Sequence, residues 1–74
     1  MFEKLKTILV DELSLNPDEI TMEADLKNDL GINSLDFAEL AFLCEDEFGV
    51  EFGEDDLHKL ITVGDVVEFL EAQA

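Results

Sequence analysis

The sequence predicts an all-α fold: a small four-helix bundle with three longer helices, one short helix and a long first loop. Apolar residues recur at spacings of three and four in several segments, and no segment shows the sustained alternation of a strand. The chain has 74 residues, 47% of them hydrophobic, so it is too apolar for a disordered acidic tail and has the length of one domain, residues 1–74.

The first helix is expected from about Phe2 to Ser14. Its apolar residues share one stripe: Phe2, Leu5, Ile8, Leu9 and Leu13. Asn16 precedes Pro17, and a residue before proline is pushed out of the helical region, so the helix ends there. Residues 16–32 are then mostly connection, which is long for a compact domain and often functional. Four apolar residues can pin this loop to the core: Ile20, Leu26, Leu30 and Ile32.

The second helix is expected to start at Asn33 or Ser34 and to end before Gly49. Asn33 is a good N-cap, and Asp36 follows three residues later, where a carboxylate favours the exposed amides and the positive end of the helix dipole. Gly49 is a natural C-cap because glycine adopts the left-handed conformation easily.

Two further helices complete the bundle. A short third helix is expected over residues 54–61, and a last helix runs through about Glu71. Thr62 followed by Asp65 resembles a capping box with Asp in place of Glu, which opens that last helix. The apolar residues expected to pack are Leu57, Leu60 and Ile61 in the third helix and Val66, Val67, Phe69 and Leu70 in the last.

The second helix has an unusual pattern when its residues are placed at 3.6 per turn. The face expected to be buried holds Phe37, Leu40, Ala41, Cys44 and Phe48, and the opposite side holds Asp36, Glu39, Asp46 and Glu47. Leu35, Ala38 and Phe42 lie between the two. They either pack under the long loop or form an exposed apolar stripe with a charged border, which is typical of a protein-docking surface.

The charge of the chain is strongly negative. Twenty Asp and Glu stand against four Lys, a formal net charge of −16, and ten of the carboxylates lie between Lys27 and Lys59 with no Lys or Arg among them. Nucleic acids and anionic membranes would be repelled, whereas basic protein surfaces would be attracted. The single Cys44 excludes an intramolecular disulfide. No signal peptide or membrane span is recognisable, so the cytoplasm, or the equivalent interior of an organelle, is the default expectation for the location. The chain is expected to be a monomer.

One segment closely resembles the acyl carrier protein family. It reads Asp29-Leu30-Gly31-Ile32-Asn33-Ser34-Leu35-Asp36, and the resemblance continues through Glu45-Asp46-Glu47-Phe48-Gly49 and Thr62-Val63-Gly64-Asp65. The resemblance covers nearly the whole chain and implies a four-helix bundle. It also implies that a phosphopantetheinyl transferase, with coenzyme A as donor, modifies Ser34 with a phosphopantetheine arm whose thiol carries acyl groups as thioesters.

The same resemblance implies a function without catalysis, in which the domain delivers acyl cargo to basic-surfaced enzymes of fatty acid synthesis or of a specialised lipid or polyketide pathway. Partner contacts are then expected at Leu35, Asp36, Ala38, Glu39, Phe42, Asp46 and Glu47. The chain departs from the family's usual pattern at Asn33, where Asp is common, and at Gly53, where proline is common. Both departures favour a specialised carrier over a housekeeping one.

Other functions are weaker interpretations. An EF-hand over residues 25–36 would have Lys27, Leu30 and Asp36 where the third, sixth and twelfth positions call for other residues, so no specific metal site is expected. His58 and Cys44 form no catalytic constellation, and burial would raise the pKa of the Cys44 thiol. An acidic interaction module without a prosthetic group, or a carrier of aminoacyl units, remains an alternative.

Overall fold

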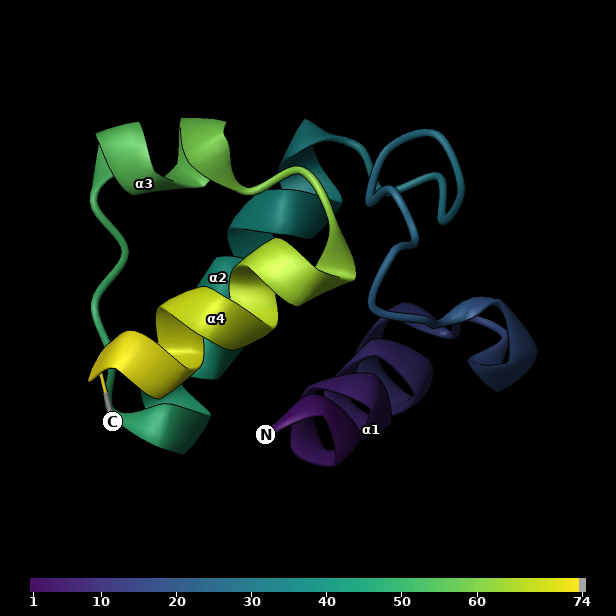
Figure 1. Ribbon diagram of the computed structural model, residues 1–74, viewed down its shortest axis with the longest axis horizontal. Helices are drawn as coiled ribbons and strands as arrows, with labels where there is room; N and C mark the ends of the chain where they lie inside the picture. The colour runs from purple at the N-terminus through teal and green to yellow at the C-terminus, as the bar shows by residue number, and fades with distance from the viewer. Residues whose placement is uncertain (74) are drawn as a thin grey trace.

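The computed structural model describes residues 1–73, and within them the chain forms four α-helices. They are α1 (Phe2–Leu13), α2 (Ser34–Phe48), α3 (Glu54–Lys59) and α4 (Val63–Gln73) (Figure 1). No strand forms in this part of the chain, so the predicted all-α bundle with one short helix is confirmed. None of the described helices is long and apolar enough to cross a membrane.

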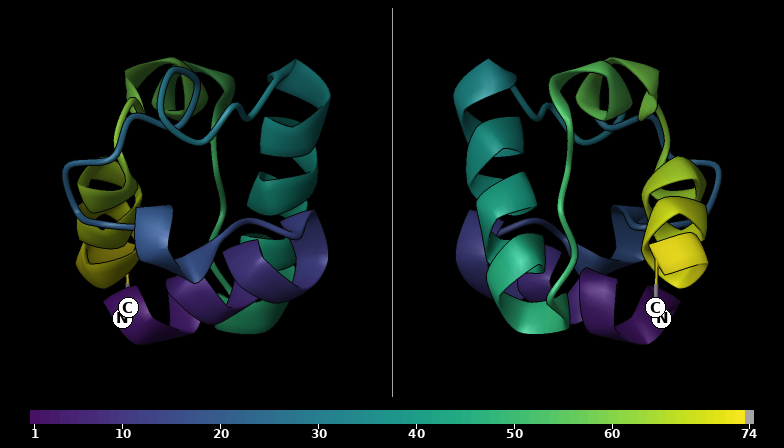
Figure 2. Two further views of the ribbon diagram at one scale, coloured as in Figure 1. Left: turned by 90° about the vertical axis from the view of Figure 1, so that its right-hand side faces the viewer. Right: turned by 90° about the vertical axis from the view of Figure 1, so that its left-hand side faces the viewer.

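The helices enclose one core. Figure 2 shows α2 and α4 on opposite sides, with α1 crossing between them at one end and α3 at the other. The core consists of Leu5, Leu9, Ile20, Ala24, Leu26, Leu30, Ile32, Leu40, Cys44, Val50, Leu60, Val63, Val66, Val67 and Leu70. The four residues predicted to pin the long loop are among them, so buried apolar side chains hold the loop against the bundle.

The ends of α1 and the loop that follows differ from the prediction. The helix ends at Leu13, one residue early, because Ser14 adopts the left-handed conformation (φ 55°) and its amide donates to the carbonyl of Leu9. Asn16 and Pro17 then start a separate turn of 3₁₀ helix, Pro17–Glu19, in which the Asn16 side chain accepts the amide of Asp18 at 2.9 Å. The predicted connection over residues 16–32 therefore begins with a short 3₁₀ helix.

The predicted caps of the other helices are confirmed. Asn33 Oδ1 accepts the amide of Asp36 at 2.8 Å, and Gly49 has a φ of 67° after the last residue of α2. Thr62 Oγ1 accepts the amide of Asp65 at 3.1 Å, while the Asp65 carboxylate accepts the amide of Thr62 at 3.0 Å. These reciprocal bonds satisfy amides that a helix start leaves without partners.

The long loop is fastened to the junction between α3 and α4. The amide of Leu26 donates to Ile61 O at 2.9 Å, and the amide of Val63 donates to Ala24 O at 3.0 Å. Next to them, the amide of Gly64 donates to Met22 O at 2.8 Å. These bonds end α3 at Lys59, two residues before the predicted end, because Ile61 is drawn into pairing with the loop. The last helix runs to Gln73, two residues beyond the prediction.

Candidate functional site

Ser34 is the first residue of α2 and is exposed. Its position follows from the neighbouring Asn33, whose backbone is extended and whose side chain caps the helix, so the chain turns sharply into α2 at this point. The first amides of a helix lack partners within it and carry partial positive charge, which suits a phosphate ester on a residue placed here. The nearby Asp36 carboxylate opposes that effect at the same helix end.

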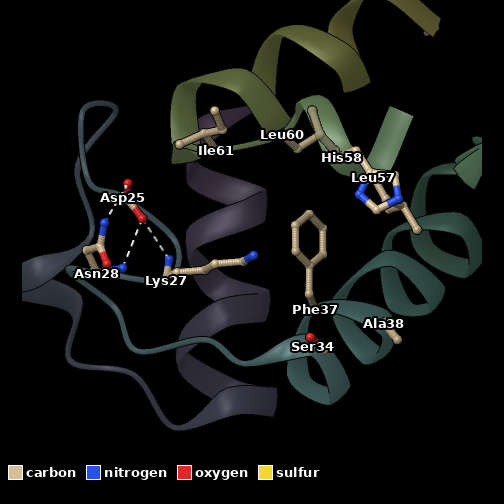
Figure 3. Close-up of a pocket in the computed structure, with 10 residues that line it drawn as sticks. All are labelled: Asp25, Lys27, Asn28, Ser34, Phe37, Ala38, Leu57, His58, Leu60 and Ile61. Atoms are coloured by element: carbon tan, nitrogen blue, oxygen red, sulfur yellow. Dashed lines mark hydrogen bonds between the residues drawn. The ribbon is translucent and has the colours of Figure 1, made fainter. Parts of the chain in front are cut away.

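A groove of about 410 Å³ opens beside Ser34. Three segments line it: Asp25, Lys27 and Asn28 from the long loop, Ser34, Phe37 and Ala38 from α2, and Leu57, His58, Leu60 and Ile61 from α3 and the residues after it (Figure 3). Figure 3 shows the Phe37 ring pointing from α2 into the groove toward the α3 side, and the Lys27 side chain reaching in from the loop. Ser34 bears the only hydroxyl side chain of this lining.

The loop side of the groove is rigidified by Asp25. Its carboxylate accepts the amides of Lys27 and Asn28, each at 2.9 Å, and the amide of Asp25 itself donates to Asp29 Oδ2 at 2.8 Å. The amide of Asn28 is the main reason that the pKa of Asp25 lies below its ordinary value. The carboxylates of Asp25 and Asp29 therefore accept hydrogen bonds from backbone amides. Within residues 1–73, no group of three Asp, Glu, His or Cys side chains is placed so that it could hold a metal ion.

The two residues considered for catalysis occupy ordinary positions. Cys44 is buried, and burial, with a smaller effect of the Glu45 charge, raises the pKa of its thiol to about 11. A thiol with that pKa is protonated at neutral pH and is a poor nucleophile. His58 is exposed on α3 and lines the groove, a position that the sequence pattern did not indicate.

The predicted partner surface lies along α2. Leu35 and Phe42 are 81% and 68% exposed, and Ala38 is exposed as well, so these residues do not pack under the long loop. Glu39, Asp46 and Glu47 are also exposed, whereas Asp36 is half-buried. The structure therefore has an exposed apolar stripe with acidic neighbours on the same helix.

The face of α2 that was predicted to be buried is only partly buried. Leu40, Ala41 and Cys44 are buried, but Phe37 and Phe48 are half-exposed. Phe37 lines the groove beside Ser34, and Phe48 is the last residue of α2. Ile61, expected to pack with the third helix, is 56% exposed because it follows the end of α3.

The two departures from the resembled pattern are compatible with this fold. Asn33 caps α2 as an Asp would. Gly53 precedes α3, and its amide donates to Asp56 Oδ2 at 3.0 Å, a bond that a proline could not make because it has no amide hydrogen. Gly53 therefore supports the start of α3 by a hydrogen bond and not by a fixed ring.

The structure is a small helical domain in which an exposed serine begins α2 beside a groove. The family described as the phosphopantetheine attachment site matches residues 3–70. This chain belongs to that phosphopantetheine-binding family, whose members bear a covalently attached phosphopantetheine. The residues present fit such a group, since an exposed hydroxyl stands at a helix N-terminus and borders a largely apolar groove.

Proposed function

We propose that this chain carries acyl groups on a phosphopantetheine arm attached through the Ser34 hydroxyl, and that it delivers them to partner enzymes. The observation that supports the attachment point is that Ser34 is exposed, begins α2 and is the only hydroxyl residue lining the groove. The arm supplies a flexible tether ending in a thiol, on which acyl cargo is held as a thioester. The protein's own contribution is the position of that tether, the groove beside it and the docking surface around it.

The exposed surface of α2 supports the second part of the proposal, which is docking to partner enzymes. A partner with an apolar patch can cover Leu35, Ala38 and Phe42, while its basic rim meets Glu39, Asp46 and Glu47. A net charge of −16 steers such basic enzymes, including the phosphopantetheinyl transferase, toward the domain. One end of α2 thus serves attachment, and the exposed residues along the helix serve docking.

The pathway is proposed to be a specialised lipid or polyketide pathway and not housekeeping fatty acid synthesis. Asn33 removes a carboxylate beside the attachment residue, which changes the charge that a transferase or partner meets there without loss of the cap. Fatty acid synthesis and the transport of aminoacyl units are the alternatives, and loading with a series of acyl and aminoacyl donors distinguishes them.

Incubation with coenzyme A and a broad-specificity phosphopantetheinyl transferase tests the attachment. The chain should gain the mass of one phosphopantetheine, and Ser34→Ala should gain none while keeping its helical content, since Asn33 still caps α2. The chain has one other serine, Ser14, and Ser14→Gly is the matched control because glycine accepts its positive φ. A mass gain by Ser34→Ala would overturn the assignment.

A further inference from the structure

Phe37 is the first large side chain on the route from Ser34 into the core. Residues three and four apart share one side of a helix, so Ser34, Phe37 and the pair Leu40 and Ala41 follow one another along α2. Burial rises along this row: Ser34 is exposed, Phe37 is half-buried, and Leu40 is 1% exposed. The Phe37 ring therefore stands between the surface groove and the buried part of the helix.

The groove stops at this ring. On the α2 side its lining consists of Ser34, Phe37 and Ala38, of which only Phe37 is large, and it does not extend to Leu40 or Cys44. Figure 3 shows the ring directed across the groove toward Leu57 and Leu60 on the other wall. Phe37 also packs against the core cluster, so the ring fills space that a linear chain would need in order to go deeper.

We propose that Phe37 is a specificity-determining gate, which lets the groove shelter short acyl groups and keeps longer chains out of the space between α2 and the α3–α4 junction. This inference rests on the proposed function, because it concerns cargo tethered at Ser34. A chain that passes the ring must displace it toward solvent. That displacement offsets the gain from the first methylenes that enter. With the ring removed, each further buried methylene should favour the sheltered state about fourfold.

The test tethers chains directly at the attachment position and needs no transferase. The thiol introduced by Ser34→Cys reacts with ethyl, butyl, octyl and dodecyl methanethiosulfonates, which joins each alkyl chain to the cysteine through a mixed disulfide and releases methanesulfinate. The native thiol of Cys44 stays unlabelled because it is buried and its pKa is about 11, which intact mass verifies. Melting temperature is then measured against chain length with Phe37 present and with Phe37→Ala.

With Phe37 present, the melting temperature should rise from ethyl to butyl and then level off. With Phe37→Ala, it should continue to rise through octyl and dodecyl. Phe48→Ala is the matched control, since it removes the same ring from the same helix at a half-buried position outside the groove, and it should keep the wild-type levelling. An equal dependence on chain length with and without Phe37, whether rising or flat, overturns the gate.

Phe37→Leu serves as a second variant with a smaller loss of apolar volume, and it should shift the levelling to longer chains. This readout does not use the phosphopantetheine arm. Failure of the gate would thus leave attachment at Ser34 standing, and failure of attachment in the coenzyme A experiment would leave the chain-length result standing.

Discussion

Two neighbouring sides of α2 have apolar residues in opposite environments. Leu40, Ala41 and Cys44 are covered by the rest of the bundle, whereas Leu35 and Phe42 are among the most exposed large hydrophobic residues of the described chain. Hydrophobicity is similar on both sides, so it does not explain the difference. The covered side stabilises the fold, whereas the open side contributes little to folding and has the composition of a docking surface.

The largest expected effect separates these two sides by stability. Leu40→Ala should lower the free energy of unfolding by about 2–5 kcal/mol, because it removes buried methyl groups and leaves a cavity. Phe42→Ala should change it by less than about 0.5 kcal/mol, because the ring is 68% exposed. Urea denaturation is the suitable measurement, since urea does not screen the net charge. A loss of 2 kcal/mol or more for Phe42→Ala would contradict the exposed stripe.

A second prediction concerns what holds the long loop against the bundle. A Cβ atom added at Gly64 would lie 2.9 Å from the carbonyl oxygen of Met22, which itself accepts the Gly64 amide at 2.8 Å. Gly64→Ala should therefore force the loop away from α4 and cost about 1–3 kcal/mol. Gly53→Ala is the comparison, because there the nearest atom, at 3.1 Å, belongs to the Asp56 side chain and can rotate away. Equal losses in urea melts would contradict the close approach at Gly64.

A smaller effect on stability is expected at the cap of α4 when the pH is lowered. The amides of Thr62, first, and of Ile61 hold the pKa of Asp65 below its ordinary value of 3.8. Because the pKa of Asp65 is lowered in the folded state, its charged carboxylate adds stability at pH values above 3.8. This added stability is lost as the pH falls through the folded-state pKa. Asp65→Asn should therefore be less stable than wild type near neutral pH, by about 1 kcal/mol or less. The melting temperatures of wild type and Asp65→Asn, measured against pH, should converge below pH 3.8.

The control for this prediction is Glu68→Gln, which removes a charge from an exposed residue of the same helix. Protonation also relieves the general repulsion of a chain with a net charge of −16, so only the difference between each variant and wild type is informative. A wild-type advantage over Asp65→Asn that persists unchanged in acid would show that the carboxylate charge has no part in the cap.

Local residue types predicted much of this architecture. Asn33, Gly49 and the pair Thr62 and Asp65 act within one helical turn, so their roles could be inferred from sequence spacing alone. The ends of α1 and α3 could not, because Ser14 takes a left-handed conformation that few residues adopt and Ile61 is engaged by Leu26 from a distant part of the chain. Such contacts join segments whose sequences give no sign of the pairing.

The candidate site could be predicted from the sequence only in part. The residues around Ser34 are contiguous in sequence and could be recognised as one motif. The rest of the groove could not be, because Lys27 and His58 come from segments that only the folded chain brings beside α2. The half-burial of Phe37 was also missed, since helical periodicity assigns a residue to a face but does not show where the covering elements end.

Attachment of phosphopantetheine at Ser34 is tested most directly by peptide mass. Cleavage after Lys27 and Lys59 of the transferase-treated protein releases residues 28–59, in which Ser34 is the only hydroxyl side chain, while Thr7, Ser14, Thr21 and Thr62 fall in other peptides. Under reducing conditions, which remove any disulfide at Cys44, residues 28–59 should retain the full mass of one phosphopantetheine. An unmodified 28–59 peptide, or the added mass on any other peptide, would contradict the assignment.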